Sequence, residues 1–531
     1  MKQFYLLLIL CFTCLIGFSQ KSFHVFPKDS KTNPGSTSGD GSLNNPWDLQ
    51  TALNQKPDKV NGGDTIWLHE GIYTGRFVSK LKSTITGKQI VVSSFNNEWA
   101  ILNGNIPNPK NVATLSVHGN NVTYQNFEVS ARNLEIRTKG ITDFIQFGGI
   151  SHNSGKNCQF INLIIHRNNG LGFGSWNKTG GTIISNCIVY NNGYIDVDGG
   201  GRGEGFYVQN DSDDQIRILK NNIIFNNYYK GVEVWSASRN ADREWVKNII
   251  LDNNVIFNSG LVSNRTVDNI IVATDDRNSI NIAKNIKIKN NILYHNTNYS
   301  ENQVNGDAPS LTIGFYHKSP AENVEVTNNI ILGRNNPLRL LYAKNFNITN
   351  NIFYGGYIHV LPQSASQLTH STLDNNKYYT KNRTPFFVNG KKYTFNKWKE
   401  VYKSDVNSEY NHLKEFDLPA VLDIEKNPYK ENTFRVTAFN KRGNDIMVDF
   451  SQFNLPVNSR YEIRDVENFK TLLKKGHLNE TYTIVLPMDV ERYPSKTLNN
   501  FGVFIISFEK PVLSEEENDG FFKSLFRWLG F

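Results

Sequence analysis

The chain has 531 residues, of which 39% are hydrophobic and 12% aromatic, and this composition excludes an intrinsically disordered protein. Abundant Asn and 39 Gly, with only 3 Met and 17 Pro, favour turns and stacked polar side chains over a helical bundle. The formal net charge of +8 suits either an anionic ligand or an ordinary soluble surface. We expect no nucleic-acid binding, because no basic stretch with interleaved aromatic residues is present.

The first twenty residues, MKQFYLLLILCFTCLIGFSQ, have the pattern of a cleaved signal peptide. Lys2 precedes an apolar stretch from Phe4 to Ile16 that is short for a membrane span, and Leu15 after Cys14 does not suit lipoprotein processing. We therefore predict an exported protein, whether periplasmic, at the outer surface or secreted, with no stable membrane span.

Two cysteines remain once residues 1–20 are removed. Cys158 and Cys187 each follow an Asn at what look like matching places in consecutive repeats, so we expect the two to stack inside the fold. A disulfide and a pair of buried thiols both remain open.

A phrase of the form apolar-x-apolar-x-Asn-Asn-apolar-apolar recurs along the middle of the chain. Examples are IRILKNNIIFNN, IILDNNVIFNS, IKIKNNILYHN and VEVTNNIILGR, and the repeated asparagines stand at positions 222, 254, 291, 329, 351 and 376. A constant kernel at uneven spacing is typical of a solenoid in which a fixed strand and turn alternate with loops of changing length. We expect these asparagines to tolerate left-handed backbone geometry and to form a stacked amide ladder, which is a structural role.

The N-terminal part carries a specific resemblance. Residues 46–53 predict a short amphipathic helix that closes one end of the solenoid. The segment SGDGSLNNPWDLQTAL followed by GGDTIWLHEGIYTG resembles the opening of the pectin-lyase-like β-helix superfamily, which includes the pectate lyases and the alginate lyase and chondroitinase B group of Bacteroidota. The similarity runs through the Asn repeats to about Tyr379 and implies a right-handed parallel β-helix.

We therefore predict an all-β chain with two folded parts. Residues 21–380 form the β-helix, and residues 381–433 form a linker or cap with a short helix near 397–403. Separated apolar runs in residues 434–511 predict a small antiparallel β-sandwich, and residues 512–531 form a tail.

The segment GGGRGEGFYVQND, residues 199–211, is the richest in candidate functional groups. If Phe206 points inward, alternation directs Tyr207 outward, and the same reasoning directs Glu233 outward on the next coil, beside Tyr207. Related β-helix proteins carry a similar phrase with His at the position of Glu204. A glycine-rich structural turn is the alternative interpretation of this segment.

The resemblance suggests β-elimination on a uronic acid, which requires neutralisation of the sugar carboxylate, a base near C5 and an acid for the group leaving C4. We predict catalytic roles for Tyr207, His166, His317, Lys318 and Arg202. We predict substrate contacts from Glu204, Gln209, Glu233, Trp235, Arg277, Tyr316 and Arg339. Strand capping and solvated surface charge are the alternatives for the histidines, lysine and arginines among them.

No cofactor is certain, although clustered loop carboxylates suit a Ca²⁺ ion. The clusters are Asp196 with Asp198, Asp211 with Asp213 and Asp214, and Asp275 with Asp276. Solvated loop acids are the alternative interpretation of each cluster.

The predicted partner is an acidic polysaccharide or oligosaccharide, with algal uronides such as ulvan or alginate as first choices, and the protein is expected to be a monomer. The reaction is either chain cleavage by a lyase or loss of water by an oligosaccharide dehydratase. Two alternatives remain open. One is a polygalacturonase-like hydrolase that pairs Glu204 with Glu233, and the other is a non-catalytic glycan-binding scaffold.

Overall fold

The computed structural model describes residues 20–96, 98–107, 112–295, 309–333, 335–469, 471–489 and 499–509. The predicted tail, and all of the predicted leader except Gln20, lie outside these ranges. Within them, no helix combines the length and the apolar character needed to cross a bilayer.

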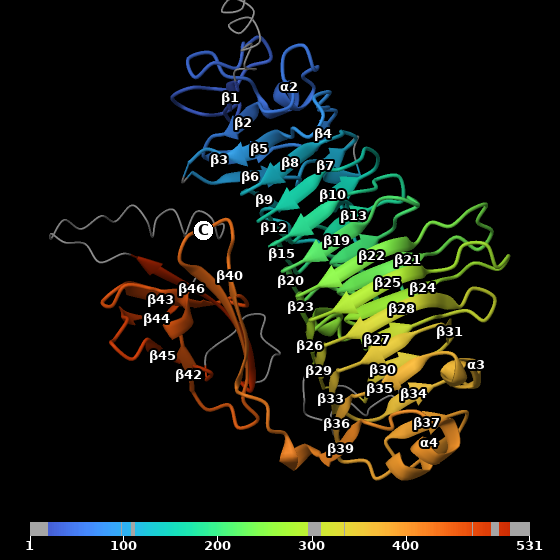
Figure 1. Cartoon of the computed structure of the whole chain (residues 1–531). Helices are drawn as coiled ribbons and strands as arrows, with labels where there is room; N and C mark the ends of the chain where they lie inside the picture. Colours follow the sequence, from blue (N-terminus) through green and yellow to red (C-terminus); the bar gives the residue numbers. More distant parts are fainter. Residues whose placement is uncertain are drawn as a thin grey trace, which may run out of the picture.

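Three long sheets, built from successive coils of the chain, form the main body of the molecule (Figure 1). Sheet 1 contains β1 (Ser22–Val25), β2 (Thr65–Leu68), β5 (Ile90–Ser94), β8 (Val122–Gln125), β11 (Gln159–Ile161), β14 (Ile183–Ser185), β19 (Arg217–Lys220), β22 (Lys247–Asp252), β25 (Lys284–Lys289), β28 (Ala321–Thr327), β31 (Ala343–Lys344), β32 (Asn347–Thr349) and β35 (Thr372–Asp374).

Sheet 2 contains β4 (Phe77–Ser79), β7 (Ala113–Val117), β10 (Gly148–His152), β13 (Phe173–Ser175), β18 (Phe206–Val208), β21 (Val232–Ser236), β24 (Ile270–Thr274), β27 (Pro309–Ile313), β30 (Asn336–Leu340), β34 (Ile358–Val360), β37 (Phe386–Val388) and β38 (Lys391–Tyr393). Sheet 3 contains β3 (Gly71–Thr74), β6 (Ala100–Asn103), β9 (Glu128–Ser130), β12 (Ile164–His166), β15 (Ile188–Tyr190), β20 (Ile223–Phe225), β23 (Val255–Phe257), β26 (Ile292–Tyr294), β29 (Ile330–Leu332), β33 (Ile352–Gly355), β36 (Lys377–Thr380) and β39 (Glu409–His412). Neighbouring strands in each sheet come from consecutive coils and run parallel, apart from the β37–β38 hairpin. The fold is the predicted right-handed parallel β-helix.

The predicted Asn ladder is present, and the two asparagines of each kernel have different structural roles. The first, as at Asn221 and Asn253, adopts left-handed backbone geometry at the corner between sheets 1 and 3. The second is buried, and its side-chain amide donates to the side-chain oxygen of the same position one coil on, as Asn222 does to Asn254 at 2.9 Å and Asn254 to Asn291 at 2.9 Å. Each coil is thereby fixed to the next through a buried, fully paired amide.

We expect Asn254→Ala to lower the free energy of unfolding by about 3 kcal/mol, because it leaves buried backbone and side-chain partners without a hydrogen bond. The lost partners include the Leu219 carbonyl, which accepts from Asn254 at 3.0 Å, and the Asn222 amide, which donates to it at 3.0 Å. Chemical denaturation would measure the change. Asn278→Ala, in an exposed loop, is the matched control and should move the midpoint very little.

The two cysteines do not stack, so this expectation was wrong. The Asn-Cys dipeptides lie at different corners of the coil, since Cys158 precedes β11 whereas Cys187 follows β14. Continuing the β11–β14 register places Cys187 over Leu163 instead of over Cys158. Both thiols are buried and free, and burial raises the pKa of each to about 12.

Short helices cover the ends and edges of the β-helix. The helix α2 (Leu49–Leu53) lies at the N-terminal end, capped by Asp48, whose carboxylate accepts from the Thr51 amide at 2.8 Å. At the C-terminal end, α4 (Phe395–Tyr402) buries Trp398, whose ring stacks on Phe386 at 4.4 Å. The remaining short elements are α3 (Pro362–Ala365), η1 (Leu261–Ser263), η3 (Ser366–Thr369), η4 (Leu413–Glu415), η5 (Ser451–Phe453) and the β16 (Tyr194–Ile195) and β17 (Gly201–Arg202) hairpin.

The C-terminal domain is a small antiparallel sandwich. Its larger sheet has the order β40 (Val421–Lys426), β41 (Thr433–Phe439), β46 (Phe501–Glu509), β43 (Arg460–Asp465) and β44 (Leu472–His477), and its smaller sheet pairs β42 (Ile446–Asp449) with β45 (Thr483–Leu486). Side chains from both sheets, such as Phe434 and Val448, share one core. The first strand, β40, lies in the segment predicted as a linker.

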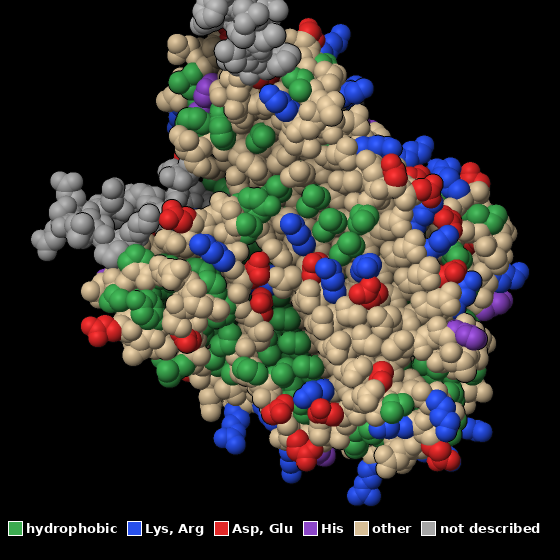
Figure 2. All heavy atoms as spheres, in the orientation of Figure 1, with side chains coloured by type: hydrophobic (Ala, Val, Ile, Leu, Met, Phe, Trp, Pro, Cys, Tyr) green, Lys and Arg blue, Asp and Glu red, His purple; other side chains and the backbone are tan. Residues whose placement is uncertain are grey.

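The sandwich packs against sheet 3 of the β-helix (Figure 1). Stacked rings of Tyr190, Phe225 and Phe257 run along that sheet, and Phe469 and Phe501 of the sandwich contact them. Hydrophobic side chains gather in the furrow between the two parts (Figure 2). Sheet 3 is therefore an internal packing surface over these coils, whereas sheet 2 carries predicted site residues such as Tyr207, Glu233 and Arg339.

Candidate functional site

The outward-facing side chains of sheet 2 form a row across the coils. The strand register places Gly174, Tyr207, Glu233 and Ile271 side by side, one from each of four consecutive strands. The neighbouring position of Tyr207 and Glu233 is the one that alternation predicted. Glu204 stands at the corner just before β18, so its carboxyl group reaches the same place.

Glu204 and Glu233 form a carboxyl pair. Glu204 is partly buried and hydrogen-bonded to the buried Glu233. Burial, and then the nearby charge of Glu233, raise the pKa of Glu204 to about 8. Glu204 therefore holds a proton at neutral pH and donates it toward Glu233. A pair in which one member keeps its proton can supply an acid and a base together.

Lys230 stabilises the anionic member of this pair. Its Nζ lies 2.5 Å from Glu233 Oε1, and only 12% of its side chain is exposed. Burial lowers the pKa of Lys230, but the charges of Glu233 and Asp268 outweigh burial and raise it above its ordinary value. Lys230 is thus a fixed cation and a hydrogen-bond donor in the site.

Asp268 links Lys230 to a predicted residue on a more distant coil. It accepts a hydrogen bond from Thr312 Oγ1, and the Arg339 Nη2 atom lies 3.8 Å from its carboxylate. Arg339 Nε also donates to Thr312 Oγ1 at 3.0 Å. Arg339 therefore supports Asp268, whose charge in turn acts on Lys230.

Aromatic rings surround the carboxyl pair. Tyr207 lies 5.2 Å from the ring of Trp176, and burial together with Glu233 raises its pKa, so its phenol keeps its proton. The Lys230 ammonium lies 4.4 Å from the centre of Tyr229 and 5.8 Å from that of Trp235. Such rings stack on the apolar faces of sugars. Gln209 lies beneath them and donates to the Trp235 carbonyl at 3.1 Å.

A buried arginine fixes the strand ends beneath these rings. Arg217 points into the β-helix with no exposed surface, and burial lowers its pKa to about 9, so it stays charged at neutral pH. It donates to the carbonyl oxygens of Ser175 at 2.9 Å and Trp176 at 3.3 Å, and also to those of Gln209 and Thr179. The backbone that carries Trp176 and Gln209 is thereby held from inside.

The other predicted residues of this face lie at its rim. Arg202, on the β16–β17 hairpin, pairs with Asp196 at 3.1 Å and Asp198 at 2.7 Å. Arg277 pairs with Asp275 at 2.5 Å, and its guanidinium stacks on Tyr316 at 3.5 Å. The next two residues, His317 and Lys318, are exposed. The structure therefore places none of these rim side chains in contact with the carboxyl pair.

His166 lies on a different face. It ends β12 in sheet 3, where Nε2 is 2.9 Å from a Glu128 carboxylate oxygen and the ring stacks on Tyr190 at 4.8 Å. Burial raises the pKa of Glu128, but His166 outweighs this and brings it below its ordinary value. His166 and Tyr207 do not lie in one site, because they face outward from different sheets.

The predicted calcium-binding clusters already have partners. Asp196 and Asp198 pair with Arg202, Asp213 pairs with Lys247, and Asp275 pairs with Arg239 and Arg277. Asp211 lies 3.6 Å from Arg243, Asp214 accepts from Ser212, and Asp276 accepts from backbone amides such as that of Ile280. Over the described ranges, no group of three or more His, Cys, Asp or Glu side chains could hold a metal ion.

Sequence reasoning missed Lys230, Trp176 and Asp268. For Lys230 a signal was present, because aligning EGFYV with KGVEV places Glu204 and Lys230 at the same corner of consecutive coils, as the β18–β21 register shows. Trp176 follows β13, whose short sequence FGS gives only a weak strand signal. Asp268 gave no signal, since it stands alone before an apolar strand.

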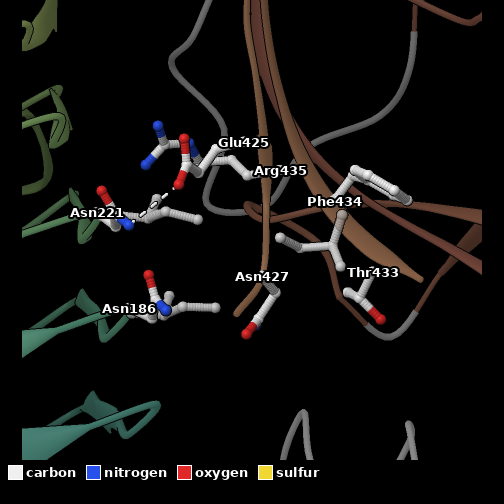
Figure 3. Close-up of a pocket in the computed structure, with 10 residues that line it drawn as sticks. Asn186, Asn221, Glu425, Asn427, Thr433, Phe434 and Arg435 are labelled. Atoms are coloured by element: carbon white, nitrogen blue, oxygen red, sulfur yellow. Dashed lines mark hydrogen bonds between the residues drawn. The ribbon is translucent and has the colours of Figure 1, made fainter. Parts of the chain in front are cut away.

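A separate cavity lies at the junction of the two domains (Figure 3). Asn186 and Asn221 line it from the β-helix, and Glu425, Asn427 and Phe434 line it from the sandwich. Its volume of about 30 Å³ has room for one or two waters but not for a sugar ring. Asn221 donates to Glu425 at 3.2 Å, so this cavity belongs to the domain contact.

Comparisons with known proteins find likenesses of structure. No family model matches the sequence, and no curated protein matches it. Pectate lyase Pel9A is 15% identical, with 76% of this chain and 83% of that chain covered and a TM-score of 0.45. An alginate lyase from Paenibacillus is 17% identical, covering 67% and 97%, with a TM-score of 0.41. A family GH136 lacto-N-biosidase from Eubacterium ramulus is 11% identical, covering 74% and 67%, with a TM-score of 0.48.

At such low identities and TM-scores these likenesses say nothing about the reaction. The fold assignment follows from the strand pairing of this chain itself. With its three parallel sheets, N-terminal helix and buried Asn ladder, the chain has the fold of a right-handed parallel β-helix.

Proposed function

We propose that this protein is a carbohydrate-active lyase that performs β-elimination on uronic-acid-containing glycans. The observation that carries the proposal is the neighbouring carboxyl groups of Glu204 and Glu233, the latter paired with Lys230, on the outer face of sheet 2. Lys230 and Tyr207 are proton donors at neutral pH, so the site offers several donors to a sugar carboxylate. The predicted leader would bring the enzyme, as a monomer, to an acidic glycan outside the cytoplasm.

The two carboxyl groups supply the acid and the base of the reaction. Glu233 takes the proton from C5, the electrons of that bond form the double bond between C4 and C5, and the bond from C4 to its oxygen breaks. Glu204 gives its proton to the departing oxygen. Because the two carboxyl groups are hydrogen-bonded, the proton gained by Glu233 can return to Glu204 and restore the starting state. The products are a 4,5-unsaturated uronide and either a shorter glycan or water.

Glycoside hydrolysis is the second candidate, since it also uses two carboxyl groups. Retaining hydrolases hold theirs about 5 Å apart and inverting hydrolases hold theirs farther apart, which leaves room for the sugar or for a water. Glu204 and Glu233 interact directly through a hydrogen bond, which differs from the separated carboxyl groups of both classes. This contact favours proton exchange within the pair and hence elimination.

The test is to incubate the protein lacking residues 1–20 with uronic-acid polysaccharides and oligosaccharides, with and without a chelator. We expect ultraviolet absorbance from an unsaturated uronide. Chain cleavage would identify a polysaccharide lyase, and loss of the mass of water alone would identify a dehydratase. New reducing ends without absorbance would contradict elimination and indicate hydrolysis. Neither signal across the panel would indicate the binding scaffold.

A further inference from the structure

Trp176 lies on the outer surface of sheet 2, one strand from Tyr207. Its ring covers Gly174, because a Cβ atom at Gly174 would lie 3.1 Å from the indole Nε1 and 3.2 Å from two ring carbons. The indole Nε1–H donates to Ser151 Oγ at 2.9 Å, on the preceding coil. A glycine in the row and a hydroxyl beside it thus let the large ring lie against the sheet.

The position of this ring is fixed from below. Arg217 donates to the Trp176 carbonyl at 3.3 Å, and the Trp176 amide donates to the His152 carbonyl at 3.2 Å. The Trp176 side chain is nevertheless partly exposed. A partly exposed aromatic face on a rigid strand end is preorganised for a ligand, since little entropy is lost when the ligand binds.

We propose that Trp176 is a stacking platform for a second sugar ring of the substrate chain, on the N-terminal side of the carboxyl pair. The inference rests on the proposed function and deepens it by adding a subsite. The Gly174 strand lies two strand spacings, about 10 Å, from the Glu233 strand, a distance that a short run of linked sugars spans. Polar groups for the hydroxyls of such a sugar stand beside it, at Asn153 and His118, which are 3.3 Å apart.

The platform fixes the direction and the minimum length of the substrate. Trp235 lies on the Glu233 strand itself, 5.1 Å from the exposed ring of Phe315, which follows a strand two spacings farther on. A glycan that contacts Trp176 and the carboxyl pair together must cross the strands of sheet 2 along the axis of the β-helix. The substrate is therefore an oligosaccharide or polymer, and a single uronic acid reaches only part of the site.

The test measures the affinity of saturated uronide oligosaccharides of increasing length, by calorimetry, on a Glu204→Gln background that prevents turnover. We expect Trp176→Leu to weaken binding of the longer oligosaccharides about tenfold and to leave the shortest unchanged. Trp176→Phe, which keeps an aromatic face, should retain most of the affinity. Trp67→Leu, at a partly exposed Trp in sheet 1, is the matched control, and thermal melting checks the fold of each variant.

An equal loss at every length, no loss at any length, or no binding by the parent protein would overturn the platform. The two proposals fail separately. If Trp176→Leu shows the length-dependent loss of affinity but the unmodified protein converts no uronide, the platform is supported and the elimination is contradicted. If uronides are converted but Trp176→Leu does not change oligosaccharide affinity, the elimination is supported and the platform is contradicted.

Discussion

Replacing Glu204 with glutamine is expected to lower kcat on an acidic glycan by about 10²- to 10⁴-fold, the usual contribution of a positioned acid. Glutamine keeps the shape of the protonated carboxyl group and can still donate a hydrogen bond to Glu233, but it has no proton to give to the leaving oxygen. Steady-state kinetics would measure the effect. Glu425→Gln, at the domain junction, is the control and should leave kcat unchanged.

The pH dependence gives an independent check on the same residue. Since the pKa of Glu204 is raised to about 8, the acid form is present below that pH, and activity should fall as the pH rises through it. The contribution of Glu204 to the free energy of unfolding should likewise fall as the pH rises. An unfolded Glu ionises near its ordinary pKa of 4.5, so the folded state binds the proton more tightly and loses this contribution as the pH rises toward 8.

Glu204→Gln removes that ionisation, so its stability relative to the unmodified protein should increase between pH 6 and pH 9. Melting curves at both pH values would measure the difference. Unchanged activity of Glu204→Gln would remove Glu204 as the acid, and an unchanged stability difference would show that its pKa is not raised.

The β-helix was predictable because its signal repeats. The Asn-Asn kernel and the period-two alternation were enough to expect the ladder at Asn222 and Asn254 and the neighbouring positions of Tyr207 and Glu233. The residues that the sequence did not predict lie at corners between strands, where the alternation of side chains stops. Lys230 stands at a corner, and side-chain direction there depends on the bend of the backbone instead of on a period of two.

The assignment of strands to faces was the second obstacle. Each coil contributes a strand to three sheets, so an outward side chain has three possible surfaces. His166 and Tyr207 both point outward, but from sheets 3 and 2. In the sandwich, β40 and β44 escaped prediction because they are edge strands, where the polar sequences VLDIEK and LLKKGH lack a strong apolar signal.

Arg217→Met is expected to lower the free energy of unfolding by about 3 kcal/mol or more. Methionine fills much of the space but removes every donor, and each buried oxygen left without a partner costs about 1–3 kcal/mol. The affected oxygens include the carbonyls of Ser175, Gln209 and Thr179. Chemical denaturation would measure the change, with Arg217→Lys as an intermediate variant that keeps the charge but makes fewer bonds.

The same substitution connects the interior of the β-helix to its outer face. Arg217 holds the backbone at the ends of β13 and β18, from which Trp176 and Gln209 extend. If the β-helix interior positions the Trp176 platform, then Arg217→Met should weaken the binding of long oligosaccharides more than that of short ones. This comparison requires conditions under which the variant is still folded. A loss of stability with unchanged oligosaccharide affinity would contradict that connection and confine Arg217 to a role in folding.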